Sequence, residues 1–407
     1  MSAGVDTANI LTLGGDDRTR SDEGGMKAWN AKYPHIVVSG DVTTSGGKHF
    51  SNAITADDLK EVVSDTPIKC PLTLMDVRAA KDYVSGHIDG AISTPSDDSD
   101  AIKSAINPNA LYVLICYSGN SKADAARNVM VNDFGISDDR IIVLTGGMKA
   151  WTGDTVSSYH YVNAKTTYNN LENPDYVVLD VRKAADYKAG HIPGAVSADV
   201  DGAVTNATDE TKATAQANVQ AVVDKYGKDK KYIVICYSGN RYAQAGTACL
   251  LDAGVNNDNI FTLGGDDSTQ SSEGGMKAWT ANYKDYTVAE HTSSAGKYFQ
   301  NSITVDQLKA DLSGSELYTV LDVRAADDYE KGTIDGAISA PSDDASALKS
   351  AVDGNPNGLY VLVCYTGNSK ADAARNILVN SFDVPEDRVI VLQGGKAAWD
   401  DANGTSN

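Results

Sequence analysis

The sequence predicts an α/β protein made of three similar domains in tandem, preceded by part of another. Three observations lead to this prediction: one short stretch occurs three times, short β-branched runs alternate with helical segments, and a longer period relates the start of the chain to its middle. Strands that alternate with helices are typical of a central parallel sheet flanked by helices, with functional loops at the carboxyl ends of the strands.

The repeated stretch consists of an apolar run, a cysteine, a tight polar loop with a glycine, and an alanine-rich segment. In the first copy, Val113–Ile115 has the character of a buried parallel strand. Gly119 permits a sharp turn that a side chain would obstruct, and Ser121 is the expected N-cap of the following helix. The three copies are Leu111–Lys122, Lys231–Tyr242 and Leu359–Lys370.

The position of the cysteine in this stretch predicts a reactive thiol. Cys116 is expected at the end of a strand, in a loop whose backbone N–H groups point inward above a helix N-terminus. Such a place stabilises a thiolate, an anionic substrate or a negatively charged sulfur intermediate. A cysteine that ends a strand can also be a small buried hydrophobe. Three of the five cysteines fall at this position, which favours the reactive thiol.

Internal similarity sets the expected domain boundaries. Ala3–Asp17 matches Ala253–Asp267, and the likeness continues to near the C-terminus. We expect a partial domain at 1–48, without a cysteine loop, and complete domains at 49–155, 156–288 and 289–407. The partial domain would supply a strand at Asn9–Leu13, a Gly-Gly turn and a helix through Trp29. A lone parallel strand leaves backbone groups unpaired, so we expect this segment to dock on a neighbouring domain, to pair with another chain, or to be disordered. Its simplest explanation is a chain that begins inside a repeat of a longer array.

Each complete domain is expected to follow one order of elements. In the first, these are a helix from Thr55, a strand at Leu72–Arg78, a helix, turn and strand over Asp82–Ile92, a capped helix within Ser96–Ile106, and a last strand at Ile141–Leu144. The second domain carries two longer polar insertions, Asp201–Thr214 and Asp266–Glu273. Their Asp, Ser, Thr and Asn content predicts surface loops.

Composition excludes several classes of function. The net charge is −20 with no basic cluster, so nucleic acid is not an expected partner. No apolar run is long enough for a transmembrane helix, and no signal peptide is expected at Met1. The cysteines do not form a disulfide framework, and with six histidines no metal-ligand spacing occurs. Cys70 and Cys249 lie outside the repeated loop and are expected to be structural or incidental. Free thiols suit the cytoplasm, but the polar composition equally suits an exported or periplasmic protein, so the compartment stays open.

An ordered set of motifs recurs three times: Asp-Val-Arg, Asp-Tyr-x-x-Gly followed by His-Ile or Thr-Ile and x-Gly-Ala, the cysteine loop, and a Gly-Gly turn with Ala-Trp. This set resembles the rhodanese (sulfurtransferase) family, as a tandem multidomain member. The resemblance implies transfer of sulfane sulfur: a thiolate takes sulfur from a donor such as thiosulfate as a persulfide and passes it to cyanide or a thiol. It implies no metal and no cofactor.

The resemblance also assigns roles to the three loops. Cys116, Cys236 and Cys364 match the family's nucleophile. Five residues after each cysteine would cradle the persulfide, namely Tyr117, Ser118, Gly119, Asn120 and Ser121; Tyr237, Ser238, Gly239, Asn240 and Arg241; and Tyr365, Thr366, Gly367, Asn368 and Ser369. Each loop has six positions, counted from Cys116 to Ser121 in the first. The family relatives that act on phosphate or arsenate have a loop one residue longer, so the resemblance implies that these loops act on sulfur. Only the second loop has arginine at the sixth position, so we predict that the Cys236 domain uses thiosulfate best and that the others prefer a less anionic donor, such as a persulfide.

The sequence also allows other interpretations of the function and of single residues. The chain could be a sulfur carrier or persulfide relay with little turnover, or a non-catalytic scaffold, although a scaffold would not need three cysteines. Asp180 and Arg182, like their counterparts, could act in acid–base chemistry or form a buried salt bridge that holds the strand end against Asp186. His87 and His191 become Thr333 in the third domain, which favours a turn-capping role over a catalytic one.

Overall fold

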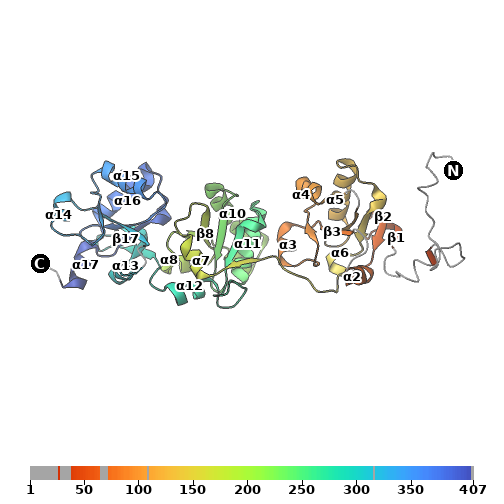
Figure 1. Cartoon of the computed structure of the whole chain (residues 1–407), viewed down its shortest axis with the longest axis horizontal. Helices are drawn as coiled ribbons and strands as arrows, with labels where there is room; N and C mark the ends of the chain where they lie inside the picture. Colours follow the sequence, from red (N-terminus) through yellow and green to blue (C-terminus); the bar gives the residue numbers. More distant parts are fainter. Residues whose placement is uncertain (1–25, 28–37, 65–71, 108–109, 315–316, 405–407) are drawn as a thin grey trace. The chain divides into compact units, whose positions relative to one another are not determined.

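The computed structural model describes residues 26–27, 38–64, 72–107, 110–314 and 317–404. The predicted strand Asn9–Leu13, the Gly-Gly turn after it and Trp29 lie outside the described residues. The chain forms two compact units, Met1–Ser158 and Tyr159–Asn407, which we describe separately. The first unit holds one sheet and the second holds two (Figure 1). We call the three sheets with their helices the first, second and third domains.

The first domain has a six-stranded sheet in the order β1-β2-β6-β5-β3-β4. Its strands run parallel except for an antiparallel hairpin of β1 and β2, so the sheet includes residues before the predicted boundary at 49. Its elements are β1 Ser39–Thr43, β2 His49–Ile54, α2 Ala56–Ser64, β3 Leu72–Asp76, α3 Ala80–Ser85, β4 Ile92–Ser93, α4 Ser99–Ala105, β5 Leu111–Ile115, α5 Ser121–Asn132, η2 Asp138–Arg140, β6 Ile141–Leu144 and α6 Gly147–Ala150.

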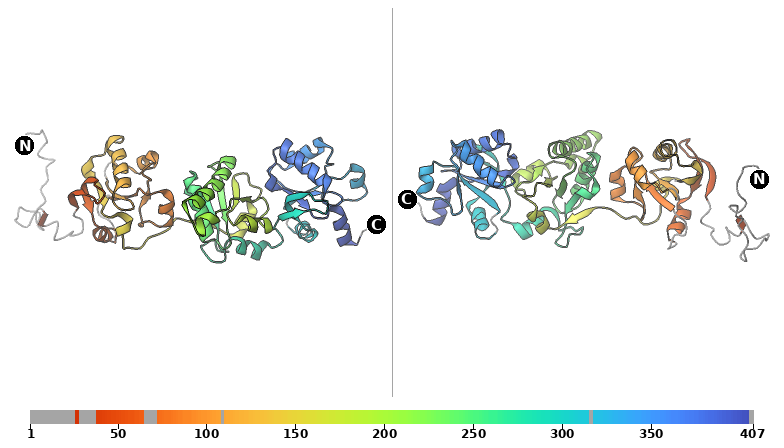
Figure 2. Two further views of the ribbon diagram at one scale, coloured as in Figure 1. Left: turned by 180° about the vertical axis from the view of Figure 1, so that it is seen from behind. Right: turned by 45° about the horizontal axis from the view of Figure 1, so that its top comes forward.

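Apolar strands with both faces buried explain why helices lie on both sides of this sheet (Figures 1 and 2). One core layer joins Tyr112 and Leu114 of β5 to Met130 of α5. The other joins Val113 and Ile115 to α2 and the end of the domain. Alternate residues of the same strand therefore serve opposite layers, as the pleat of a strand requires.

The second unit repeats this architecture twice. Its five-stranded sheet has the order β7-β11-β10-β8-β9 and lacks the hairpin, whereas its six-stranded sheet, β12-β13-β17-β16-β14-β15, has one. The second domain comprises β7 His160–Val162, α7 Ala164–Asn169, β8 Tyr176–Asp180, α8 Ala184–Ala189, β9 Val196–Ser197, α9 Asp201–Val204, α10 Asp209–Tyr226, β10 Lys231–Ile235, α11 Arg241–Asp252, η3 Asn257–Asn259, β11 Ile260–Leu263 and α12 Gly275–Tyr283. The third comprises β12 Ala289–Thr292, β13 Tyr298–Ile303, α13 Val305–Leu312, β14 Tyr318–Asp322, α14 Ala326–Glu330, β15 Ile338–Ser339, α15 Ala345–Gly354, β16 Leu359–Val363, α16 Ser369–Ser381, η4 Glu386–Arg388, β17 Val389–Leu392 and α17 Gly395–Asn403.

The prediction of a surface loop at Asp201–Thr214 is wrong. Most of this insertion is helical, because it contains α9 and the first turns of α10. Thr208 and Thr211 form a reciprocal capping box, and Ala215 and Val219 bury an apolar face one turn apart. Polar composition concealed these short helix signals. The second insertion, Asp266–Glu273, contains no helix or strand, as predicted.

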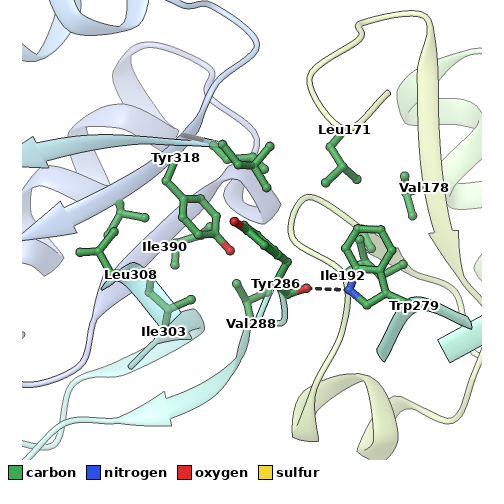
Figure 3. Close-up of a cluster of buried hydrophobic side chains, with 14 of the residues drawn as sticks. Leu171, Val178, Ile192, Trp279, Tyr286, Val288, Ile303, Leu308, Tyr318 and Ile390 are labelled. Atoms are coloured by element: carbon green, nitrogen blue, oxygen red, sulfur yellow. Dashed lines mark hydrogen bonds between the residues drawn. The ribbon is translucent and has the colours of Figure 1, made fainter. Parts of the chain in front are cut away.

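The second and third domains share one apolar core layer. Figure 3 shows Tyr286 and Val288, from the connecting segment, between Trp279 and Ile192 of the second domain and Tyr318 and other side chains of the third. Trp279 is fully buried, and its indole Nε1 donates to the carbonyl oxygen of Tyr286 at 2.7 Å. The tryptophan of the Gly-Gly motif therefore has a packing role in this domain and holds the connecting segment in the shared layer.

Polar groups also cross this contact. The Nε2 atom of His191 lies 2.9 Å from Oδ1 of Asn301, and its Nδ1 atom lies 2.8 Å from the carbonyl oxygen of Tyr187 at the end of α8. The contact of His191 Nδ1 with the carbonyl oxygen of Tyr187 fits the predicted turn-capping role. Tyr226 donates its hydroxyl to Asp387 at 3.1 Å, and the Lys225 Nζ lies 4.0 Å from the same carboxylate. Burial raises the pKa of Asp387, although Lys225 opposes the shift.

The pKa of Asp387 predicts a pH dependence of stability in the second unit. The folded unit holds this proton more tightly than the unfolded chain, so stability is lost as the pH rises from about 3.9, the ordinary value, through the raised folded value. Asp387→Asn removes the buried charge and should raise the unfolding temperature at neutral pH, with a gain that shrinks toward about pH 4.

Thermal unfolding of both proteins across this range measures the effect. Asp139→Asn is the matched control, because Asp139 occupies the corresponding place in the first domain and is exposed. Its change should be small at every pH. A wild-type chain more stable than Asp387→Asn at neutral pH would contradict the assignment.

Candidate functional site

Each loop cysteine lies directly after the central strand of its sheet. Cys116 follows β5, Cys236 follows β10 and Cys364 follows β16, and each is only 2% exposed. A backbone N–H of the loop points at each sulfur: the Gly119 amide donates at 3.0 Å, the Gly239 amide at 3.1 Å, and the Asn368 amide at 3.2 Å. One loop amide in each domain therefore points inward at the sulfur, as the sequence predicts for the loop N–H groups, and an amide so placed can stabilise an anion that forms there.

Two glycines per domain shape the loop. Gly119 has a φ of +73°, and a Cβ there would lie 2.8 Å from the carbonyl oxygen of Leu144. Gly147, from the Gly-Gly turn, has a φ of +57°, and a Cβ there would overlap the carbonyl oxygen of Cys116. The next amide, of Met148, donates to that same oxygen at 2.8 Å. The Gly-Gly turn therefore supports the cysteine loop, a contact that the sequence did not predict.

The helix after each loop begins at the sixth position of the motif. The prediction that Ser121 caps α5 is wrong, because Ser121 is the first helical residue and Asn120 occupies the cap position. Asn120 makes no side-chain cap bond, and the same holds for Asn240 before α11 and Asn368 before α16. The positive end of each helix dipole is therefore directed at the loop without a side-chain oxygen to offset it.

The predicted cradle residues divide into buried and accessible groups. Gly119, Gly239 and Gly367 are buried, whereas the sixth positions are exposed. The described side chains therefore leave the rim of each loop open to a small solute. The half-buried members are Ser118, Asn120, Tyr237, Ser238, Asn240 and Asn368, and the exposed ones are Tyr117, Ser121, Arg241, Tyr365, Thr366 and Ser369.

The Asp-Val-Arg motif forms a buried ion pair in every domain. In the second, the Arg182 guanidinium donates from Nε and Nη2 to both carboxylate oxygens of Asp180, at 2.7–3.1 Å, and from Nη2 to the carbonyl oxygen of Gly190. Arg78 and Arg324 make the same contacts. Because both carboxylate oxygens accept from the arginine, this geometry supports the salt-bridge interpretation. Asp186 is not the arginine's hydrogen-bond partner.

Asp186 instead binds the tyrosine that follows the cysteine. The Tyr237 hydroxyl donates to Asp186 at 2.6 Å and accepts from the Lys183 amide at 3.3 Å. Burial and this carboxylate raise the pKa of Tyr237, so the phenol stays protonated. Tyr117 and Tyr365 bind Asp82 and Asp328 in the same way. The recurrence of Asp-Tyr and Cys-Tyr in all three domains was the signal available in the sequence.

A cleft lies beside the loop tyrosine in the second and third domains. The cleft of the second domain has a volume of about 480 Å³, and Met276 and Thr287 are among the residues that line it. The carbonyl oxygen of Thr287 accepts from Nε2 of Gln307 in the third domain at 2.7 Å. The cleft of the third, about 520 Å³, has Lys396 at the position of Met276, where it pairs with Asp400 at 2.6 Å. The two clefts therefore differ in the side chain at this position, an apolar thioether in one and a paired ammonium in the other.

Among the described residues, no group of His, Cys, Asp and Glu is arranged to hold a metal ion. Within those same ranges, no helix combines the length and apolar character that a bilayer span requires. Cys249, which the sequence assigned no reactive role, is buried in α11 against the core.

Residues 55–154, 163–282 and 304–402 match the sequence profile of the rhodanese-like domain. The chain belongs to the rhodanese-like family. It is 30% identical over 117 residues to a putative sulfur carrier protein of Bacillus subtilis (strain 168), a match that covers 27% of this chain and 59% of that protein. It is 24% identical to a thiosulfate sulfurtransferase of Pseudoalteromonas translucida (strain TAC 125), over 31% of this chain and 95% of that one. A solved structure of a thiosulfate sulfurtransferase from Pseudomonas aeruginosa is 17% identical, with a TM-score of 0.22, over 94% of this chain and 72% of that one.

The support of the rhodanese-like loop by the Gly-Gly turn predicts an asymmetric effect of alanine substitution. Gly395 and Gly336 both have positive φ, of +59° and +78°. A Cβ at Gly395 would overlap the carbonyl oxygen of Cys364, whereas at Gly336 it would meet nothing within 4 Å. Gly395→Ala should therefore destabilise the third domain by clearly more than about 1 kcal/mol, and Gly336→Ala by about 1 kcal/mol from backbone strain alone.

Denaturant unfolding of the two variants measures this difference. Gly395→Ala should also slow the reaction of Cys364 with a thiol reagent under native conditions, because the loop must shift. Equal losses of stability in the two variants would show that the overlap is relieved without cost.

Proposed function

We propose that this chain is a sulfurtransferase that moves sulfane sulfur through persulfides on Cys116, Cys236 and Cys364. The observation that carries the proposal is the backbone N–H directed at each sulfur, at 3.0–3.2 Å, in a loop before a helix N-terminus. Membership of the rhodanese-like family supports it. So does the similarity to two relatives, a putative sulfur carrier protein and a thiosulfate sulfurtransferase.

The proposed chemistry has two balanced steps. The cysteine thiolate attacks the sulfane sulfur of thiosulfate, a new S–S bond forms, and sulfite leaves with the electron pair of the broken S–S bond. The cyanide carbon or a thiolate sulfur then attacks the terminal sulfur of the persulfide, and the cysteine thiolate leaves. Both the thiolate and the persulfide are anions, so the same loop amides stabilise the start and the end of each step.

The donor is proposed to differ between the loops. Arg241 presents a planar guanidinium at the rim of the second loop, which suits the sulfonate oxygens of thiosulfate. Its side chain is exposed and donates from Nη2 to the carbonyl oxygen of Val204 at 3.2 Å. The first and third loops have serine there, and the lysines that follow, Lys122 and Lys370, each lie within 3.4 Å of an aspartate. A less anionic donor, such as a persulfide, suits these two sites.

A swap of the sixth residue tests the donor preference. In a chain that keeps only Cys236, with Cys116→Ser and Cys364→Ser, Arg241→Ser should raise the thiosulfate KM about tenfold or more, because a charge-assisted hydrogen bond is lost. In the chain that keeps only Cys364, Ser369→Arg should lower it. The measurement is thiocyanate formation at fixed cyanide and varied thiosulfate. An unchanged KM in both chains would refute the donor assignment.

A sulfur carrier or persulfide relay is the second candidate, and the similarity to a putative sulfur carrier favours it. A carrier would load sulfur onto the same cysteines but release it only to a partner protein. Multiple turnovers of thiosulfate with cyanide by the wild-type chain support the enzyme. Stoichiometric loading without turnover would support the carrier, and unreactive cysteines would support a scaffold.

A further inference from the structure

An asparagine occupies the fifth position of every cysteine loop, and in the first and third domains its side chain braces the loop from within. Nδ2 of Asn120 donates to the carbonyl oxygen of Ser118 at 3.2 Å and to its Oγ at 3.1 Å. Nδ2 of Asn368 makes the same two contacts with Thr366, at 3.2 Å and 2.8 Å. Ser118 and Asn120 flank Gly119, whose amide points at the cysteine sulfur, so these bonds help to fix the direction of that amide.

In the first domain, a segment outside the loop holds the other end of this side chain. The Gly46 amide, in the turn between β1 and β2, donates to Oδ1 of Asn120 at 3.0 Å. The turn is closed by the Thr44 amide, which donates to the carbonyl oxygen of Lys48 at 2.8 Å, and Lys48 pairs with Asp124 of α5 at 2.9 Å. The hairpin is therefore fastened to the helix that follows the loop, and its tip reaches the loop asparagine.

The second domain lacks the hairpin, and its insertion Asp266–Glu273 reaches the equivalent asparagine instead. Nε2 of Gln270 donates to Oδ1 of Asn240 at 3.4 Å, and Nδ2 of Asn240 donates to the carbonyl oxygen of Ser271 at 3.3 Å. Two different segments, a hairpin turn and an insertion, thus hold the same loop position in the first and second domains.

The third domain has the hairpin but not this contact. Its turn is closed by the same bond, from the Ser293 amide to the carbonyl oxygen of Lys297 at 2.8 Å, and the same ion pair joins it to the following helix. Ala295 stands at the position of Gly46. Oδ1 of Asn368 is buried and has no hydrogen-bond partner among the described residues.

The methyl group of alanine explains this difference. A Cβ placed at Gly46 would lie 2.7 Å from Oδ1 of Asn120 and 2.9 Å from its Cγ, which is closer than van der Waals contact allows. An asparagine that faces alanine therefore cannot approach the turn amide in this way. The φ of Gly46 is not in the left-handed region, so the backbone of the turn itself permits alanine.

We propose that Gly46 is a positioning residue of the Cys116 site, and that Ala295 removes the same support from the Cys364 site. The inference rests on the proposed function and deepens it, because it names a residue that prepares one of the three sulfur sites. Through Asn120, the hairpin turn holds the loop amides in the direction that stabilises a thiolate or a persulfide. The two loops form a matched pair, since from the cysteine to the following lysine they differ only in serine or threonine at the third position.

Alkylation of the reduced full chain by iodoacetamide at neutral pH, followed by peptide mass spectrometry, measures the reactivity of each cysteine separately. Gly46→Ala should slow alkylation of Cys116 about fivefold, the factor that corresponds to the loss of one hydrogen bond, because the loop stabilises the thiolate less well. The rate at Cys364 in the same sample should not change. Ala295→Gly should speed alkylation of Cys364 by a similar factor and leave Cys116 unchanged.

Two further measurements separate positioning from a general loss of stability. The Gly46 amide, although its residue is exposed, should be protected from hydrogen exchange, and Asn120→Ala should abolish that protection. In the Asn120→Ala chain, Gly46→Ala should cause no further slowing at Cys116, because both changes remove one contact. Gly40→Ala is the matched control in the same hairpin, since its Cβ would meet only a backbone oxygen at 3.7 Å, and it should leave the rate unchanged.

Either of two results would overturn the proposal. One is an unchanged rate at Cys116 in Gly46→Ala, and the other is additive slowing by Gly46→Ala and Asn120→Ala. Alkylation needs no sulfur donor, so these outcomes are separate from the proposed function. A chain that takes up no sulfur from thiosulfate or a persulfide is not a sulfurtransferase, but its alkylation rates still decide the role of Gly46.

Discussion

Backbone hydrogen bonds from the loop and from the Gly-Gly turn fix the position of each loop cysteine, whose side chain packs in a buried core layer. The carbonyl oxygen of Cys116 accepts the amide that follows the Gly-Gly turn, and its sulfur accepts the amide of Gly119. These contacts need two glycines with positive φ, a strand that ends at the cysteine, and a helix that begins five residues later. Side chains at the rim can therefore vary between domains without disturbing the sulfur.

That separation explains how the three domains diverge. The amide-to-sulfur contact recurs in all three, but the sixth loop residue is serine, arginine and serine, and the cleft beside the tyrosine has methionine in one domain and lysine in another. The buried Asp-Arg pair recurs in all three domains, and the residues of the Asp-Tyr hydrogen bond line the clefts of the second and third. One fold thus offers an amide-to-sulfur contact in each domain, from a glycine in the first two and from Asn368 in the third, with different residues around it.

The sequence was sufficient to predict those parts of the fold and the site whose signals are local and repeated. The α/β class, the strand before each cysteine and the role of Gly119 followed from periodicity and turn chemistry, and the structure confirms them. The helices at Asp201–Val204 and the start of α10 were missed, because polar residues outnumber the few that cap and anchor them. The contact of His191 with Asn301 joins residues 110 positions apart, and no local pattern indicates such a pair.

Contact between domains adds a second level of organisation to the repeat. The second and third domains share a core layer, and the connecting segment contributes both Tyr286, which fills that layer, and Thr287, which lines the cleft of the second domain. Because Gln307 of the third domain holds Thr287, the surroundings of Cys236 depend on a neighbouring domain. A tandem arrangement therefore does more than multiply identical sites.

The most direct measurement is peptide mapping by mass spectrometry after the reduced chain meets thiosulfate without an acceptor. The account predicts one added sulfur atom, removable by cyanide, on the peptides that contain Cys116, Cys236 or Cys364, with Cys236 loaded most, and none on those with Cys70 or Cys249. If neither thiosulfate nor a persulfide donor adds sulfur to any of the three loop cysteines, the loops do not perform sulfur transfer and the account is wrong.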